Sequence, residues 1–259
     1  MAEKIKLKVN NDKFVDFINM LDKLSKIDDS IRLKIDKDYI LLYSMIKSGQ
    51  TALAFKSYSI ETSEYLTCNE EFDYLIDLII PNSKKFVKNL NFIKNSEKIL
   101  FNITYKKSMD DDSIMTARSL QIHSTKLKIN WVAGEPHEMK DMTKKSLEKN
   151  LNIKNRRWYF KVSEEDFDDI KKLSNINSSR MIYIKCEKNN VKILEDGSWE
   201  MEVDTIDEER NTELILNKLY LKFIDNDQYI EFSIFDNFLL IKKDESYLML
   251  SYEKDFDDD

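Results

Sequence analysis

KVNNDKF at Lys8–Phe14 and KVSEEDF at Lys161–Phe167 begin with the same Lys-Val pair and end in the same phenylalanine. Each follows a strand-like run and opens a stretch with helical apolar spacing. A chain of 259 residues is long for one domain and comfortable for two. We expect two copies of one domain, at 1–132 and 156–259, joined by a connector at 133–155 that is poor in apolar residues.

Apolar periodicity predicts the elements of the first copy. Five apolar side chains recur at helical spacing and predict a helix over 11–27: Phe14, Phe17, Ile18, Leu21 and Leu24. A second helix is predicted over 81–95, with Pro81 in its first turn and lysines on its outer face. Strands are predicted at IRLKID (31–36), YILLYSM (39–45), KILFNITY (98–105) and SLQIHSTKLKINWV (119–132).

The second copy repeats this plan. We predict a strand at 156–162, a helix at 163–175, a hairpin at 181–194 turning at KNN, a strand at 198–206, a short helix near 216–225, and strands at 228–234, 238–243 and 246–252. The fold class is therefore α+β, built from two tandem domains.

Composition excludes several classes of enzyme. Gly49, Gly134 and Gly197 stand alone, so GxGxxG, P-loop and GxSxG motifs are absent from the sequence. His123 and His137 are the only histidines, and we interpret them as a strand-surface and a solvated residue. No catalytic residue and no cofactor are predicted.

Cysteine usage and apolar patterning indicate an intracellular protein. Cys68 and Cys186 have no metal-ligand spacing and are expected to be reduced thiols. The N-terminal residues do not resemble a secretory signal, and no apolar run reaches the length of a membrane span. We expect a cytoplasmic location, in the host cytoplasm if the protein is viral.

Three carboxylate runs are the remaining candidates for a metal-dependent site, at 109–113, 164–169 and 255–259. The first is expected to be a solvated loop and the last a tail. In the second, Ser163 is a suitable N-cap, with Glu164, Glu165 and Asp166 in the first turn and Lys171 and Lys172 in the last. This arrangement complements a helix dipole, so no metal site is predicted.

The chain resembles the sliding clamps of T-even-type bacteriophages, which have the PCNA-like fold. The resemblance rests on FKVSEEDFDDIKKLSNI (160–176), IYIKCEKNNVKI (182–193), LILNKLYLKF (214–223), YLMLSYEKDFDDD (247–259) and LKINWVAGEP (127–136). It covers nearly the whole chain as a pattern of elements. A longer first half, with an extra loop near 106–117, and a longer connector depart from the family pattern.

The resemblance implies a pseudo-sixfold ring with sheets outside and two helices per domain inside, encircling double-stranded DNA. Rings of this kind contain three two-domain or two three-domain subunits, and the chain length favours a homotrimer. The partners implied are a DNA polymerase, which the ring tethers as a processivity factor, and a clamp loader. Subunits would pair through edge strands near 114–122 and 199–206.

The resemblance also answers an objection from charge. The net charge is −7, whereas nucleic-acid-binding domains are commonly basic, but in a ring only the charge that lines the hole matters. The lysines implied to face DNA are Lys23, Lys26, Lys84, Lys85, Lys88, Lys94, Lys171, Lys172, Lys218 and Lys222. A pocket for partner peptides would include Met139, Met142 and Tyr252.

Two alternatives remain open from the sequence. One is a non-catalytic structural or adaptor protein with the same duplication but no DNA in its ring. The other is a metal-dependent phosphodiesterase that uses the acidic runs, in which Asp168 and Asp169 would be required.

Overall fold

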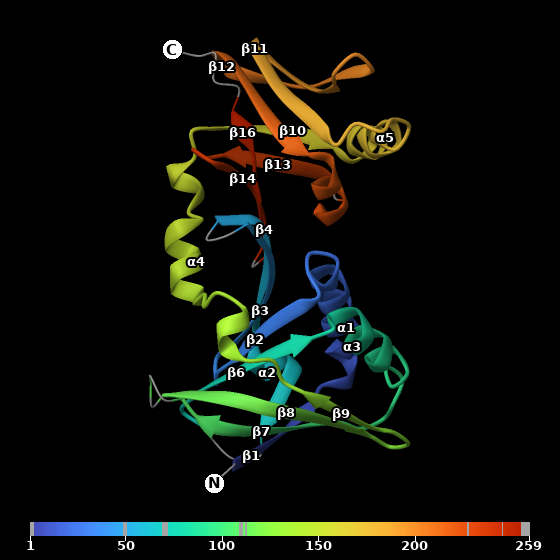
Figure 1. Cartoon of the computed structure of the whole chain (residues 1–259), viewed down its shortest axis with the longest axis vertical. Helices are drawn as coiled ribbons and strands as arrows, with labels where there is room; N and C mark the ends of the chain where they lie inside the picture. Colours follow the sequence, from blue (N-terminus) through green and yellow to red (C-terminus); the bar gives the residue numbers. More distant parts are fainter. Residues whose placement is uncertain are drawn as a thin grey trace. The chain divides into compact units, whose positions relative to one another are not determined.

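The computed structural model describes residues 3–48, 51–68, 72–108, 111, 113–226, 228–244 and 246–254. The chain, which is coloured along its sequence from blue to red in Figure 1, divides into two compact units. Unit 1 comprises residues 1–46 and 56–147, and unit 2 comprises residues 47–55 and 148–259. Residues 47–55 therefore group with the second half of the chain, where the Leu53 carbonyl accepts a hydrogen bond from Ser251 Oγ at 3.0 Å.

The first half of the chain is mostly sheet. Its elements are β1 (Glu3–Val9), α1 (Asn11–Ser25), β2 (Ser30–Ile35), β3 (Tyr39–Ser48), β4 (Thr51–Glu61), α2 (Thr62–Tyr65), β5 (Leu66–Cys68), β6 (Leu75–Pro81), α3 (Ser83–Asn91), β7 (Ile99–Lys107), β8 (Ile114–Ser124), β9 (Lys128–Val132), the 3₁₀ helix η1 (Pro136–Glu138) and α4 (Lys144–Asn150). The strand order is β4-β3-β2-β6-β8-β7-β1-β5, with β9 paired to β8. The β1–β5, β1–β7, β2–β3, β2–β6, β7–β8 and β8–β9 ladders are antiparallel, and the β6–β8 ladder is parallel.

Helices α1 and α3 pack side by side (Figure 1) and bury their apolar faces in the core of unit 1. Phe14 and Leu21 of α1 and Leu90 of α3 are fully buried. On β1, residues alternate between buried Ile5, Leu7 and Val9 and exposed lysines. The helices therefore cover one face of the sheet, and the lysines of β1 lie on the other.

The second half of the chain adds four strands to this sheet and forms a second, three-stranded sheet. Its elements are the 3₁₀ helix η2 (Ile153–Asn155), β10 (Trp158–Ser163), α5 (Glu164–Ser174), β11 (Met181–Glu195), β12 (Trp199–Asn217), the 3₁₀ helix η3 (Lys218–Phe223), β13 (Tyr229–Ile234), β14 (Phe238–Lys243), β15 (Ser246–Ser251) and β16 (Glu253–Lys254). In the first sheet the order β10-β13-β14-β15 continues into β4, whose residues 51–55 belong to unit 2, and the second sheet has the order β11-β12-β16. Helix α5 packs Phe167 against Phe232 of β13, with ring centroids 6.4 Å apart.

The prediction of a hairpin that turns at KNN is wrong. Residues 181–195 form the single strand β11, because the ladder with β12 continues beyond a register shift between Lys188, which has a positive φ of 58°, and Asn190. The chain instead turns at Asp196 and Gly197, where the glycine has a φ of 67°. An Asp-Gly pair between apolar runs is a strong turn signal, so the sequence did contain this turn.

Three other expectations change in detail. The helix predicted over 81–95 is α3, which begins after Pro81 and ends before Lys94. The short helix near 216–225 is the 3₁₀ helix η3. The run predicted as strand over 119–132 is divided into β8 and β9, which pair with each other as a hairpin.

The predicted edge near 114–122 is also wrong. β8 pairs with β7 on one side, and with β6 and then β9 on the other. Separately, the described residues contain no helix that is both long and apolar enough to cross a lipid bilayer.

Candidate nucleic-acid interface and partner site

Helix α3 presents a compact group of free cations. Its buried face carries Phe86 and Leu90, while Lys84, Lys85 and Lys88 are exposed on the opposite side. The helix contains no acidic residue, and these three lysines form no ion pair within the part of the chain that the structure describes. Their charge is therefore available to an anionic partner.

The position of α3 is fixed at its N-terminal end and along its buried face. Ser83 N donates a hydrogen bond to the Asp29 carbonyl at 2.9 Å, just before the first turn. Trp131 of β9 packs edge-on against Phe86, with ring centroids 5.1 Å apart, and donates from Nε1 to the Pro81 carbonyl at 3.2 Å. Lys94 is exposed in the turn that follows the helix.

The lysines of α1 are less free. Lys26, the C-cap residue, is exposed and pairs with Asp22 at 3.1 Å across one helical turn. Lys23 is half-buried and also has an interaction partner. Both stand at the end of α1, where a cation complements the helix dipole.

The lysines of α5 have local partners as well. Lys171 donates to the Ile224 carbonyl at 3.4 Å and to Asn226, and its ammonium lies 4.4 Å from the centroid of the Phe167 ring. Burial lowers the pKa of Lys171. Lys172 is exposed and pairs with Asp169 at 2.8 Å.

Lys218 and Lys222 of η3 differ in their exposure and in their partners. Lys218 Nζ donates to the Asn177 carbonyl at 2.8 Å and lies 3.6 Å from Oε2 of Glu195, which is 1% exposed. Lys222 is exposed, with its ammonium 5.1 Å from the Phe223 ring centroid. Lys218 therefore has a structural partner that the sequence pattern did not reveal, because Glu195 lies 23 positions earlier in the adjoining hairpin.

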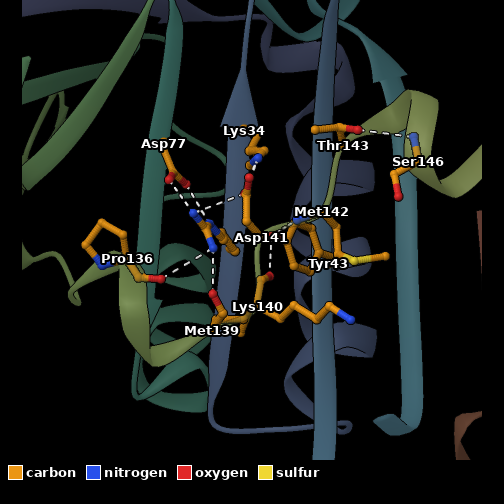
Figure 2. Close-up of polar contacts among 11 residues, drawn as sticks. Lys34, Tyr43, Asp77, Pro136, Met139, Lys140, Asp141, Met142, Thr143 and Ser146 are labelled. Carbon is orange, nitrogen blue, oxygen red and sulfur yellow. Dashed lines mark hydrogen bonds and ion pairs between the residues drawn. The ribbon is translucent and has the colours of Figure 1, made fainter. Parts of the chain in front are cut away.

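The structure also reveals a buried ionic cluster on β2 that sequence reasoning missed. Alternation in IRLKID places Arg32 and Lys34 on a solvent-facing side, yet they are only 3% and 1% exposed. Arg32 forms a two-pronged pair with Asp77 of β6, from Nε to Oδ1 at 2.7 Å and from Nη2 to Oδ2 at 2.5 Å (Figure 2). The connector covers this face of the sheet.

Arg32 and Tyr43 hold the connector in place (Figure 2). Arg32 Nη1 donates to the Met139 carbonyl at 2.6 Å. The Tyr43 hydroxyl donates to the Lys140 carbonyl at 3.0 Å and accepts from Met142 N at 3.2 Å. Three of the four residues from Met139 to Met142 are thus bound through their backbones, a contact that the composition of the sequence does not predict.

Asp141 completes the cluster. Its Oδ1 pairs with Lys34 Nζ and lies 3.2 Å from Arg32 Nη2, although the side chain is 55% exposed. Burial alone lowers the pKa of Arg32, but the hydrogen bond and charge of Asp77 and the charge of Asp141 outweigh it and raise the pKa overall. For Tyr43, burial raises the pKa, so its hydroxyl stays protonated and can donate.

A glycine allows the connector to start close to the sheet. Gly134 N donates to the Ile79 carbonyl at 2.9 Å. A Cβ at this position would lie 2.8 Å from Cγ2 of Ile79 and 2.5 Å from Oε2 of Glu138, closer than side chains tolerate. Gly134 is therefore required by this approach.

The predicted peptide-pocket residues fall in different units. Met139 is buried and Met142 half-buried in unit 1. Tyr252 is buried in unit 2, where its hydroxyl donates to the Phe235 carbonyl. It lines a cavity of about 220 Å³ with Arg157, Trp158, Arg210, Asn211, Thr212, Leu214 and Ile234. Within the described residues, the three side chains are therefore not shown to form one pocket.

The acidic run of α5 is a helix start. Ser163 Oγ accepts a hydrogen bond from Asp166 N at 3.1 Å, as predicted for the N-cap. Asp168 accepts from Asn226, and Asp169 pairs with Lys172. The described residues contain no group of three side chains suited to hold a metal ion. Of the run at 109–113 only Asp111 and Ser113 are described, and the run at 255–259 lies outside the described residues.

No family model matches the sequence, and no curated protein matches it. Solved structures do match, and those named below are DNA polymerase sliding clamps, beta subunits and PCNA. The DNA polymerase sliding clamp of Pseudomonas aeruginosa matches with a TM-score of 0.68 and 12% sequence identity. The match covers 96% of this chain and 66% of that chain. DNA polymerase III subunit beta of Borrelia burgdorferi has a TM-score of 0.63 at 11% identity, and covers 96% of this chain and 64% of its own.

Proliferating Cellular Nuclear Antigen of Entamoeba histolytica has a TM-score of 0.61 at 16% identity, and covers 98% of this chain and 100% of its own. The chain thus spans slightly less than two thirds of these two bacterial chains and the whole of the PCNA chain. The α+β fold is that of the sliding clamps, as the sequence predicted.

Proposed function

We propose that this protein is a sliding clamp, a non-catalytic ring that encircles duplex DNA and tethers a replicative DNA polymerase. The observation that carries the proposal is the clamp fold over nearly the whole chain, combined with a helix, α3, whose exposed face carries three free cations and no acidic residue. Phosphate contacts by lysines attract DNA without reading sequence. Such an attraction is compatible with sliding.

The DNA-facing surface is proposed to centre on Lys84, Lys85 and Lys88, with Lys94 beside them. Lys23, Lys26, Lys172 and Lys222 extend it. Lys171 and Lys218 contribute least, because their ammonium groups already have partners within unit 2. The acidic net charge of −7 is no obstacle, because only the local charge facing DNA contributes to the attraction.

Subunits are proposed to pair through strand edges, as a homotrimer. β9 pairs only with β8, and residues 199–206 of β12 pair only with β11 among the described ladders. Each therefore leaves one row of backbone groups open to another chain. Full coverage of the PCNA chain, against about two thirds of the bacterial ones, supports three subunits rather than two. Light scattering should then give about 93 kDa, three times 30.9 kDa.

The proposed partners are a DNA polymerase and a clamp loader, and both are proposed to dock through a short peptide. Tyr252 and its cavity in unit 2 are the proposed docking site for a short peptide of either partner. Met139 and Met142 belong to the connector in unit 1 and are proposed to make partner contacts of their own. The resemblance to T-even-type clamps makes a phage replisome, in the host cytoplasm, the proposed setting.

The test is processive synthesis on primed single-stranded DNA by the cognate polymerase and loader. Product length per binding event should rise when the protein is added and fall back when Lys84, Lys85 and Lys88 become alanine. An unchanged product length would favour the adaptor alternative. Cleavage of DNA with Mg²⁺ that disappears when Asp168 and Asp169 become asparagine would favour the phosphodiesterase and contradict the proposal.

A further inference from the structure

Phe92 is the most exposed of the large apolar side chains described, at 82%. It is the C-cap of α3, with φ −68° and ψ −23°, and its N–H donates to the Asn89 carbonyl at 3.2 Å. The helical conformation therefore continues through this residue. Its ring extends the outer surface of α3, while the next residue, Ile93, is buried in the core.

The ring is aligned with two of the free lysines. Lys85, Lys88 and Phe92 are spaced by three and four residues, which places them in one row along a helix, about 5–6 Å apart between neighbouring Cβ atoms. We call this row the α3 stripe. No acidic residue occurs between Ser83 and Ser96, and Lys94 adds a further positive charge. The stripe thus combines an uncovered aromatic face with cations that have no counter-ion in the described chain.

This combination distinguishes between single and double strands. In a duplex the base faces are covered by their stacked neighbours, so a surface ring meets only sugar, phosphate and groove edges. In a single strand the base faces are open, and stacking on an aromatic side chain contributes about 1–3 kcal/mol per base. A phenylalanine exposed to water lacks the favourable burial of its ring, which a stacked base would provide.

We propose that the α3 stripe binds single-stranded DNA, with one base stacked on Phe92 and the adjoining phosphates bound by Lys85 and Lys88. The inference rests on the proposed function, because it assumes that α3 faces DNA. On a primed template, the stripe would hold the unpaired template strand next to the duplex. The clamp would then distinguish the primer–template junction from uninterrupted duplex.

The test compares two fluorescein-labelled probes by anisotropy at low salt: a 20-nucleotide oligothymidine and a 20-base-pair duplex. Phe92→Ala should weaken binding of the single strand about 5- to 150-fold, which corresponds to one stacked base. It should leave the duplex affinity within about twofold. Phe92→Tyr retains a ring and should bind the single strand like the wild type, whereas Phe92→Leu retains apolar bulk without a ring and should resemble the alanine variant.

Leu127→Ala is the matched control, because Leu127 is also an exposed apolar residue, at 44%, but lies in the β8–β9 turn. It should change neither affinity. The inference would be overturned if Phe92→Ala lost affinity equally for both probes or for neither. It would also be overturned if Phe92→Leu bound the single strand like the wild type. Absence of single-strand binding by the wild type would do the same. A smaller solution mass for Phe92→Ala with unchanged DNA binding would assign the ring to a subunit contact and also overturn it.

The proposed function has separate outcomes. If the wild type raises processivity while Phe92→Ala binds both probes normally, the clamp stands and only the role of the stripe is wrong. If the wild type gives no processivity, the clamp itself fails.

Discussion

Lys34 and Asp141 form an ion pair between the middle of a sheet and the connector that covers it, with Lys34 buried and Asp141 half in solvent. Asp141 is the only carboxylate paired with Lys34 in the described chain. This pair, with the contacts of Arg32 and Tyr43, explains how a polar segment is held against a sheet without an apolar core of its own.

Asp141→Ala should leave Lys34 buried without its partner. We expect a loss of about 1–3 kcal/mol in the free energy of unfolding, less than for a fully buried pair because Asp141 is half exposed. Loosening of the connector should appear as faster tryptic cleavage at Lys140, Lys144 and Lys145. Lys34→Met fills the same space without a charge, so the double variant should recover most of the loss. Simple additivity of the two changes would contradict the pairing.

Alanine at Lys84, Lys85 and Lys88 should weaken duplex binding and lower its salt dependence. The slope of log K against log salt should fall by about 0.9 for each phosphate contact removed, hence by up to about 2.7. The matched control removes three exposed lysines of β1, Lys4, Lys6 and Lys8, which lie on the sheet face away from the helices. If both triple variants change the slope equally, the attraction follows total charge and α3 has no special role.

Lys218 and Lys222 should separate stability from DNA binding. Lys218→Ala removes the cationic partner of buried Glu195, which keeps only the hydrogen bond from Trp199 Nε1, and should reduce the free energy of unfolding by about 1–3 kcal/mol while leaving duplex affinity unchanged. Lys222→Ala, at an exposed position, should weaken duplex binding and leave the free energy of unfolding unchanged. Urea unfolding and anisotropy on the same preparations check both, and a DNA-binding defect in Lys218→Ala with normal stability would contradict the assignment.

Tyr252 should make unfolding depend on alkaline pH. Burial raises the pKa of Tyr252 to about 12, against about 10 for an unfolded chain. The folded state therefore favours the protonated phenol, and this stabilisation is complete below pH 10 and is lost as the pH rises from about 10 to 12.

Tyr252→Phe also loses the hydrogen bond to Phe235, so at pH 7 it should be about 1 kcal/mol less stable than the wild type. The difference between the two proteins should shrink above pH 10. Tyr229→Phe, whose ring is 64% exposed, is the control. A difference that stays constant up to pH 12 would show that the phenol is not held in its protonated form.

Local patterns in the sequence predicted the elements whose surroundings are simple. The apolar spacing of Phe14, Phe17 and Leu21 is sufficient to define α1, and the Ser163 cap defines the start of α5. Both signals depend on neighbours within one or two turns. The lysines of α3 were predicted in the same way, because a helix with one apolar face necessarily exposes the other.

The sequence did not predict features that depend on distant partners. Arg32 and Lys34 alternate with apolar residues like a solvent-facing row, and only the connector, about a hundred positions later, buries them. Lys218 looks like any helix lysine until Glu195 is placed beside it. The continuous β11 depends on pairing along the whole of β12, which outweighs the local turn preference of KNN.

The most direct measurement of the central claim concerns topology. The protein is loaded by its cognate loader onto nicked circular duplex DNA, and the complex is separated from free protein by gel filtration. A single restriction cut then linearises the DNA. A ring that encircles the duplex should remain on the circle at moderate salt and slide off the cut molecule. Equal retention on circular and linear DNA would show ordinary surface binding and contradict the clamp.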